Sequence, residues 1–241
     1  MDPESVENIL KDSLSLTFLG ESPQDDERSQ SNDGRLSYGH LLGSGTALPS
    51  LLSSVLPESP SLVVVTDYPD DIILNNLRDN VKRNEHAVSR GCTVLCGGYE
   101  WGHDVTYLLS LIPPSLHKSQ FQRTTGYDTV FLSVLSHFDR SHGALLASLT
   151  APLSTHHDAR SYVAAGTYTR PAVCDAFLRA AERLGIMWMQ SGGGDSTLDE
   201  DDRTWLGTLR VRELDKTQLG VRKGMCRWWV GRWSDEMLRM E

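Results

Sequence analysis

The stretch "SLVVVTDYPDDIILNNLRDN" (residues 61–80) decides the fold that the sequence predicts. Its run of valines is typical of a buried strand, because β-branched side chains favour extended backbone. Beyond Asp67 the apolar residues recur at the spacing of a helix, and either Asp70 or Asp71 is suited to cap its N-terminus. The stretch therefore predicts a strand that ends on a carboxylate and a helix that returns across the sheet.

The same alternation continues through the rest of the chain. A brief apolar stretch and a short helix precede residue 57. Further strands are predicted at 91–99, 127–135, 161–168, 204–214 and 226–233, and further helices at 104–112, 141–153 and 170–185. The last two strands are expected to form a closing antiparallel pair. Alternating strands and helices predict an α/β domain with a doubly wound, mostly parallel sheet and helices on both faces.

Length and composition fit one such domain with an appendage. The chain has 241 residues, of which 39% are hydrophobic, enough to build a core. Residues 21–35, "ESPQDDERSQSNDGR", contain no apolar side chain and are typical of an exposed tether. We therefore divide the chain into an acidic N-terminal extension (1–35) and a catalytic-type domain (36–241).

Charge and cysteine content exclude several function classes. A net charge of −9 and a pI near 5.3 argue against a general nucleic-acid binder. Four scattered cysteines indicate neither a disulfide framework nor a zinc site, so no metal is expected. The N-terminal residues lack a signal-peptide pattern, and no segment has the length of a membrane span. We expect an intracellular protein, in cytoplasm or nucleus, without a membrane partner.

Three features fall at the carboxyl ends of predicted strands, where doubly wound sheets bind ligands. Gly43 and Gly45 in "GSGTALPS" allow close backbone approach. Asp67 is placed to accept hydrogen bonds from ribose hydroxyls, and Trp101 in "GGYEWGHD" offers a flat surface for a purine. Each feature has a plainer interpretation: a simple turn, a helix cap and core packing, respectively. Their order along the chain favours a nucleoside-bearing ligand.

The glycine loop indicates which nucleoside cofactor to expect. A nicotinamide dinucleotide site uses G-x-G-x-x-G, but Leu48 stands at the third glycine position, and the lysine of a P-loop is absent. A cofactor without phosphates needs glycines only for close approach. S-adenosyl-L-methionine meets that requirement, with adenine at Trp101, ribose at Asp67 and the methionine at the Gly43–Gly45 loop.

The motifs "GTALPSLL", "VVVTDYPDDIILNNLRDNV", "GYEWGHDVTYLL" and "YDTVFLSVL" resemble methyltransferase family 16. The resemblance extends over roughly residues 38–233 and is strongest for the fungal nicotinamide N-methyltransferase-like branch, which includes elongation-factor N-terminal and lysine methyltransferases. It implies a Rossmann-like, seven-stranded fold that uses S-adenosyl-L-methionine. The residues that it assigns to the cofactor are Gly43, Ser44, Gly45, Asp67, Tyr68, Trp101 and Ser133.

The chain also departs from this family. The family loop resembles "LELGAGAGLPS", whereas here the lead-in strand is "YGHLL" without a carboxylate, and Ser44, Thr46 and Ala47 alter the turn. The family has a helix ahead of this strand that the chain lacks, so the resemblance predicts a shortened first-strand region. The fourth strand normally ends "LSDL", but Val134 replaces the aspartate.

These departures leave several functions open. The leading hypothesis is an N-methyltransferase whose acceptor is a protein lysine or N-terminus, for example on a translation elongation factor, or a small nicotinamide-like amine. The alternatives are a degenerate methyltransferase scaffold that binds a partner without catalysis, and a tailoring enzyme of secondary metabolism. No nucleic-acid partner is expected.

Candidate catalytic groups lie beyond the fourth and fifth predicted strands. An amine acceptor must lose a proton, so a nearby proton acceptor assists the transfer. We favour His137 and Asp139 over His142 and Tyr168 for this role. The adjacent pair at 156–157 is expected to lie in a polar turn without a chemical role.

Overall fold

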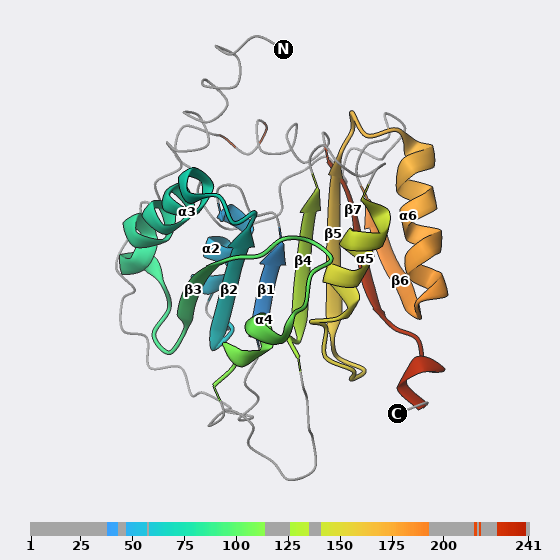
Figure 1. The fold of residues 1–241 in the computed structure, drawn as a ribbon, viewed down its shortest axis with the longest axis horizontal. Coiled ribbons are helices and arrows are strands. Elements are labelled where there is room, and N and C mark those ends of the chain that lie inside the picture. The colour runs from blue at the N-terminus through green and yellow to red at the C-terminus, as the bar shows by residue number, and fades with distance from the viewer. Residues whose placement is uncertain are drawn as a thin grey trace.

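The computed structural model describes residues 38–42, 47–56, 58–113, 126–134, 141–192, 215, 217 and 226–239. Within these residues the chain forms one seven-stranded sheet (Figure 1). Its strands are β1 (Tyr38–Leu42), β2 (Leu62–Asp67), β3 (Thr93–Gly98), β4 (Thr129–Val134), β5 (Arg160–Gly166), β6 (Ile186–Gly192) and β7 (Cys226–Trp233).

The strand order is β3-β2-β1-β4-β5-β7-β6. The first five strands are parallel, and β7 runs antiparallel to both β5 and β6. The chain moves outward from β1 to β2 and β3, then returns to place β4 on the other side of β1. The strand order therefore reverses between β1 and β4, which confirms the predicted doubly wound, mostly parallel architecture.

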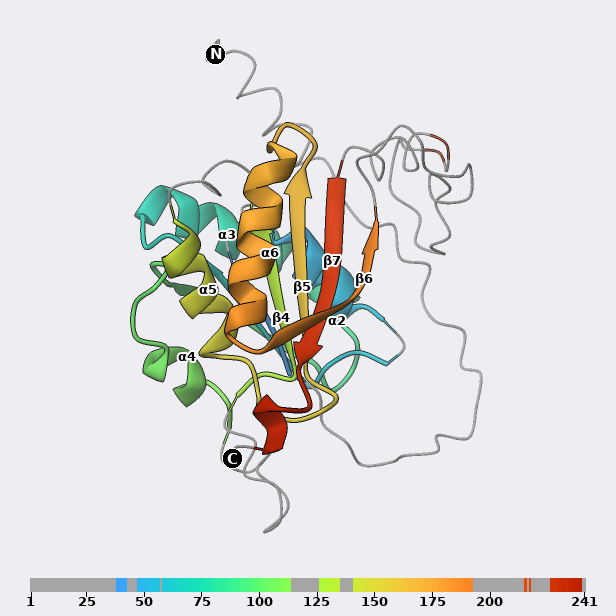
Figure 2. The same ribbon diagram turned by 90° about the vertical axis from the view of Figure 1, so that its right-hand side faces the viewer.

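Helices cover both faces of the sheet. Figure 2 shows α4, α5 and α6 on one side of the strands and α2 on the other. Their bounds, with those of α3 and two short 3₁₀ helices, are α2 (Leu48–Ser54), α3 (Asp71–Asn84), η1 (Glu85–Ala87), α4 (Thr106–Ser110), α5 (His142–Thr150), α6 (Pro171–Arg183) and η4 (Met237–Arg239).

Each face of the sheet has its own buried cluster. Alternate residues of β2 separate them: Leu62 and Val64 join the larger cluster under α4, α5 and α6, whereas Val63 and Val65 join the cluster under α2 and α3. All four side chains are at most 2% exposed. A strand buried on both faces accounts for the continuous apolar run that made this stretch recognisable.

Local signals set the ends of the two long helices. The Asp70 side chain caps α3, accepting hydrogen bonds from the amides of Ile72 and Ile73 at 2.9 and 3.2 Å. Pro171 occupies the first turn of α6, and Gly185 follows its end with φ +91°, a conformation that glycine adopts at little cost. Both helices begin and end where the sequence predicts.

The C-terminal part of the sheet corrects one prediction. Both edges of β7 are occupied, by β5 and by β6. The closing antiparallel pair is therefore β6 with β7, not residues 204–214 with 226–233, and 204–214 lie outside the described residues. Strand β6, "IMWMQSG", was not predicted, because it lacks a run of β-branched residues and follows directly on the helix that ends before Gly185.

The described helices also answer the question of a membrane span. Within the part of the chain that the structure describes, no helix combines the length and apolar character needed to cross a bilayer. The four cysteines are free thiols; Cys174 is buried and Cys226 is exposed.

Candidate functional site

The central strands end at nearly the same level, along the carboxyl edge of the sheet. Leu42, the last residue of β1, is in register with Thr66 of β2 and with Leu132 of β4. Asp67 and Ser133 therefore each stand one residue past the end of β1, on its two sides. The point where strand order reverses is thus flanked by two of the predicted cofactor residues, the place where open α/β sheets bind ligands.

Asp67 ends β2 with its carboxylate oriented by its own backbone neighbour. The amide of Tyr68 donates to Asp67 Oδ1 at 2.7 Å, and the side chain of Asp67 is half-buried. The alternative interpretation of Asp67 as the cap of the following helix is wrong, because Asp70 provides that cap. Tyr68 itself is 54% exposed, so it is accessible at this edge.

The turn after β2 is packed onto the end of β3. The amide of Tyr99 donates to the Asp67 carbonyl at 2.8 Å. A Cβ on Gly98 would lie 2.9 Å from Pro69 Cβ and 3.2 Å from Leu74 Cδ1. Only glycine fits this approach without displacing the turn. The close approach holds the Asp67 turn and the segment that carries Trp101 side by side.

The loop after β3 is fixed by helix α5. Ser148 Oγ accepts a hydrogen bond from the Gly102 amide at 2.8 Å and lies 3.2 Å from the hydroxyl of Tyr99. Ser148 Oγ donates in turn to the Ala144 carbonyl at 2.9 Å. Ser148 is fully buried. It is the positioning residue that the sequence analysis missed; a lone serine in the apolar run "ALLASL" was the available signal.

Trp101 lies in this loop, three residues past the end of β3. Its side chain is half-buried and packs against the larger core cluster. Core packing, the plainer of its two interpretations, is therefore part of its role. A place for Trp101 beside an adenine ring stays a prediction.

Ala47, the residue before α2, has an unusual backbone conformation. Ala47 precedes the helix with φ 63° and is fully buried. This left-handed conformation costs a residue with a Cβ roughly 1–2 kcal/mol, whereas glycine adopts it freely. The family pattern "LELGAGAGLPS" has a glycine at this position, where this chain has Ala47.

Several predicted site residues fall outside the described part of the chain. Gly43, Ser44 and Gly45 of the cofactor loop are among them, as are both favoured catalytic groups, His137 and Asp139. Their roles stay predictions.

The two less favoured proton acceptors are described. His142 begins α5 and packs edge-on against Phe177, with ring centroids 5.6 Å apart. Tyr168 lies in the turn between β5 and α6, 63% exposed, with its ring across Gly166. Burial, and to a lesser degree the nearby Cys226, raises the pKa of Tyr168, so its hydroxyl is a weaker acid than usual. Tyr168 is the more exposed of the two, since His142 is half-buried.

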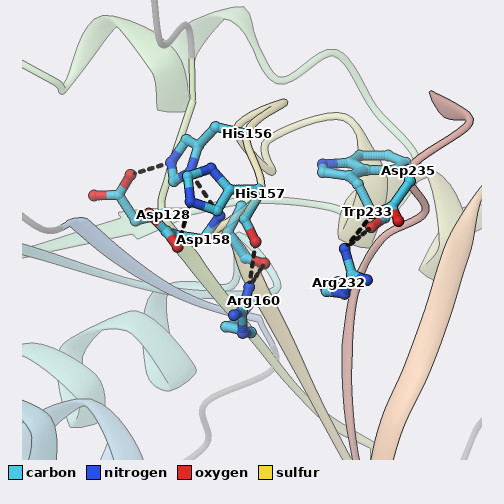
Figure 3. A network of polar contacts seen from close by, with 9 residues as sticks. Asp128, His156, His157, Asp158, Arg160, Arg232, Trp233 and Asp235 are labelled. Atoms are coloured by element: carbon cyan, nitrogen blue, oxygen red, sulfur yellow. Dashed lines mark hydrogen bonds and ion pairs between the residues drawn. The ribbon is translucent and has the colours of Figure 1, made fainter. Parts of the chain in front are cut away.

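The histidine pair at 156–157 lies at the opposite edge of the sheet, before the start of β5 (Figure 3). His156 Nδ1 accepts from the Asp158 amide at 3.2 Å, so Nε2 carries the proton and donates to Asp128 Oδ1 at 2.8 Å. The exposed His157 side chain lies 3.0 Å from Asp158. Nδ1 of His156 thus fixes the turn that enters β5, and Nε2 holds that turn against Asp128 at the start of β4, which is a structural role.

Comparison with known proteins adds to this geometry. No family model matches the chain. A protein N-terminal and lysine N-methyltransferase (efm7) of Emericella nidulans is 26% identical over 124 residues, covering 51% of this chain and 45% of the relative. The protein N-terminal and lysine N-methyltransferase EFM7 of Cryptococcus neoformans is 37% identical over 114 residues, covering 47% of this chain and 34% of the relative. Over about half its length, the chain is similar to these fungal methyltransferases.

This relationship confirms the branch that the sequence motifs indicated. The chain spans less than half the length of these two relatives. An O-methyltransferase family 2 protein from Planctomyces limnophilus superposes with a TM-score of 0.50 at 9% identity, covering 97% of this chain and 62% of that structure. At that identity the likeness concerns the fold, which is the Rossmann-like fold of methyltransferases.

Proposed function

We propose that this protein is an S-adenosyl-L-methionine-dependent N-methyltransferase whose acceptor is an amine of a protein, a lysine side chain or an N-terminus. One observation carries the proposal: a chain that is similar over about half its length to fungal N-methyltransferases folds into a sheet whose order reverses at β1 and β4, with Asp67 beside that reversal. Either feature alone would support only a fold.

The side chains at the carboxyl edge of the sheet fit the cofactor. A carboxylate at the end of β2 accepts hydrogen bonds from the two neutral hydroxyls of a ribose, and the Tyr68 amide fixes its orientation. The packing of Pro69 on Gly98 places the Trp101 loop next to that carboxylate. We assign Asp67 to the ribose, Trp101 to the adenine and Ser133 to the neighbourhood of the reacting groups.

The chemistry demands little from the protein beyond binding and alignment. When bound, S-adenosyl-L-methionine supplies the electrophilic methyl group. The chain must hold the acceptor amine in line with it and exclude water. The amine must be neutral to react, so a proton acceptor contributes to the rate. His137 and Asp139 remain the proposed groups for that step.

The class of acceptor rests on the relatives. Their names specify protein N-termini and lysines, and we extend this class to the present chain. The translation elongation factor suggested by the sequence resemblance is the acceptor to assay first. A cytoplasmic location, proposed from the sequence, is compatible with such a partner.

Mass spectrometry of transferred methyl groups tests the proposal. The purified protein is incubated with S-adenosyl-L-methionine carrying a heavy methyl group and with a fungal extract that lacks its own copy of the enzyme. We expect the heavy label on a lysine or an N-terminal amine of one protein or a few. The Asp67→Ala variant should transfer less label, whereas Asp79→Ala, an exposed carboxylate on α3, serves as control.

Two outcomes would assign a different function to the chain. Label found only on small molecules would favour a tailoring methyltransferase. A folded protein that transfers no label, does not bind the cofactor and co-purifies with one partner would support the non-catalytic scaffold, for which the lead-in strand "YGHLL" without a carboxylate is the motivating observation.

A further inference from the structure

A groove of about 540 Å³ lies between helix α3 and strand β3, away from the carboxyl edge described above. Its walls come from α3, from the loop that follows η1 and from the face of β3 that carries Val94. The residues that matter for its chemistry are Arg78, Lys82, Arg90, Cys92, Val94 and Cys96.

Strand β3 forms one edge of the sheet, with β2 as its one neighbour among the described strands. The Thr93 amide donates to the Ser61 carbonyl at 2.9 Å and the Tyr99 amide to the Asp67 carbonyl at 2.8 Å. In a parallel pair, alternate residues direct their backbone groups to the same neighbour. The backbone N–H and C=O groups of Val94 and Cys96 therefore point outward, along the open edge.

The groove is cationic although the protein is acidic. Arg78, Lys82 and Arg90 line it, and Glu85 is the one carboxylate among the described lining residues, while the whole chain carries a net charge of −9. Within the described residues, none of these three cations is in an ion pair. Arg78 and Cys96 line the same groove. Burial raises the pKa of the Cys96 thiol, and the positive charge of Arg78 opposes that rise.

A second copy of this chain does not suit the edge. Two β3 edges paired about a two-fold axis would bring Arg78 and Lys82 of one copy near the same cations of the other, and like charges repel. Cations on an edge strand discourage self-pairing in this way. They attract a strand of opposite charge.

We propose that β3 and its groove bind an extended acidic segment of a partner protein, which adds to the sheet as a further strand beside β3. The side chains of such a strand alternate between the two faces of the sheet. One set meets Arg78 and Lys82 on the α3 side and should be acidic. The other set lies on the face of Leu95 and the exposed Tyr107 and should be apolar. This surface is independent of the proposed methyl transfer.

The binding test uses a defined peptide and the full chain. A fluorescent, end-blocked peptide of alternating glutamate and valine is titrated with the protein, and a lysine–valine peptide serves as the opposite-charge probe. We expect the glutamate peptide alone to bind, with an affinity that falls as salt is added. Charge reversal by Arg78→Glu with Lys82→Glu should weaken binding roughly tenfold or more. Arg179→Glu with Arg183→Glu, on α6, makes the same charge change elsewhere and should leave binding unchanged.

The backbone is tested separately from the charges. Val94→Pro removes an N–H that points to the open edge and should abolish binding with little change in melting temperature. If that variant does not fold, peptides methylated on backbone nitrogens give the same information: methylation at the positions that face β3 should block binding, and methylation at the others should not.

Three results would overturn the proposal: equal binding of the glutamate and lysine peptides, binding that survives both the charge reversal and backbone methylation, or a dimer of the free protein that Val94→Pro dissociates. The last would assign the edge to self-association. None of these readouts depends on methyl transfer, so failure here leaves the proposed function untouched.

Discussion

Two loops at the carboxyl edge of the sheet are held in different ways. The turn after β2 also packs on the end of β3, but its side-chain hydrogen bonds are local: Asp67 accepts from the amide of Tyr68, and Asp70 caps the helix that follows. The loop after β3 is fixed from a distance, because Gly102 bonds to Ser148, 46 residues later in the chain. Both loops carry a residue that we assign to the cofactor.

The difference explains which of the two loops could be interpreted from sequence. A turn held by neighbouring residues leaves a local pattern, and residues 67–70 showed both the carboxylate and the cap. A loop held by a tertiary contact leaves no such pattern, so the role of Ser148 emerged only from the fold. The same difference predicts how each loop responds to substitution.

The largest effect is expected at Gly102. This residue has φ +83°, and a Cβ would lie 2.9 Å from Ala144 Cβ on α5. Gly102→Ala should lower the free energy of unfolding by about 2–3 kcal/mol, measured by urea denaturation, because strain and overlap add. Gly91→Ala is the control: Gly91 has φ +92° but open space around it, so its loss of about 1–2 kcal/mol reports strain alone. Equal losses in both variants would show that α5 does not press on the loop.

Removal of the serine hydroxyl should have the next largest effect. Ser148→Ala leaves the Gly102 amide and the buried Tyr99 hydroxyl without this partner, at a cost of about 1–3 kcal/mol. Thr150→Val is a matched control, because Thr150 Oγ bonds only within α5, to the Leu146 carbonyl; it should cost roughly 0.5 kcal/mol or less. Hydrogen exchange at the Gly102 amide should quicken in the first variant alone. Unchanged exchange in Ser148→Ala would contradict the tertiary anchor.

Substitutions in the turn after β2 should lower stability less, and they should not affect the loop after β3. Asp70→Ala removes the cap of α3 and should cost about 1 kcal/mol, whereas Asp70→Asn keeps an accepting oxygen and should remain near the wild-type value. Thermal or urea unfolding measures both. The Asp70 variants should not alter exchange at Gly102. A change there would mean that the two loops are coupled and that the comparison fails.

The smallest effect concerns the stability of the protein at acid pH, to which Asp104 at the end of the loop after β3 contributes. Hydrogen bonds from Thr106, its hydroxyl first and its amide next, hold the pKa of Asp104 below its ordinary value. A lowered folded-state pKa stabilises the protein at pH values above the unfolded-state pKa, and this contribution is lost as pH falls through the folded-state pKa. As the pH is lowered into the acid range, the free energy of unfolding should therefore fall slightly more steeply for wild type than for Asp104→Asn. An identical fall in both proteins would show that the hydrogen bonds from Thr106 to Asp104 do not persist in solution.

Much of the fold was predictable because its strands are either buried on both faces or followed by helices with clear end signals. Strand β2 and helices α3 and α6 are examples. Strand β6 was not predictable, since its pairing with β7 depends on residues distant in sequence. The doubly wound, mostly parallel architecture followed from the alternation of elements; the identity of the closing pair did not.

In the candidate site, too, residues marked by a local pattern were predictable, and residues that depend on tertiary contacts were not. The sequence placed Asp67 correctly at the end of its strand, because a buried run that stops at a carboxylate is a local pattern. It placed Trp101 in the correct loop and offered core packing as its plainer interpretation, which the structure confirms, but the cluster that Trp101 packs against depends on residues distant in sequence. Ser148 could be recognised only as a serine in an apolar helix.

Isothermal titration of the protein with S-adenosylhomocysteine, the demethylated form of the proposed cofactor, tests the central claim most directly. We predict binding to wild type, weakened by about 1–3 kcal/mol in Asp67→Ala, the range for hydrogen bonds to a charged group, and unchanged in Asp79→Ala. A folded wild-type protein that gives no heat with this ligand or with S-adenosyl-L-methionine, or an Asp67→Ala variant that binds as tightly as wild type, would contradict the assignment.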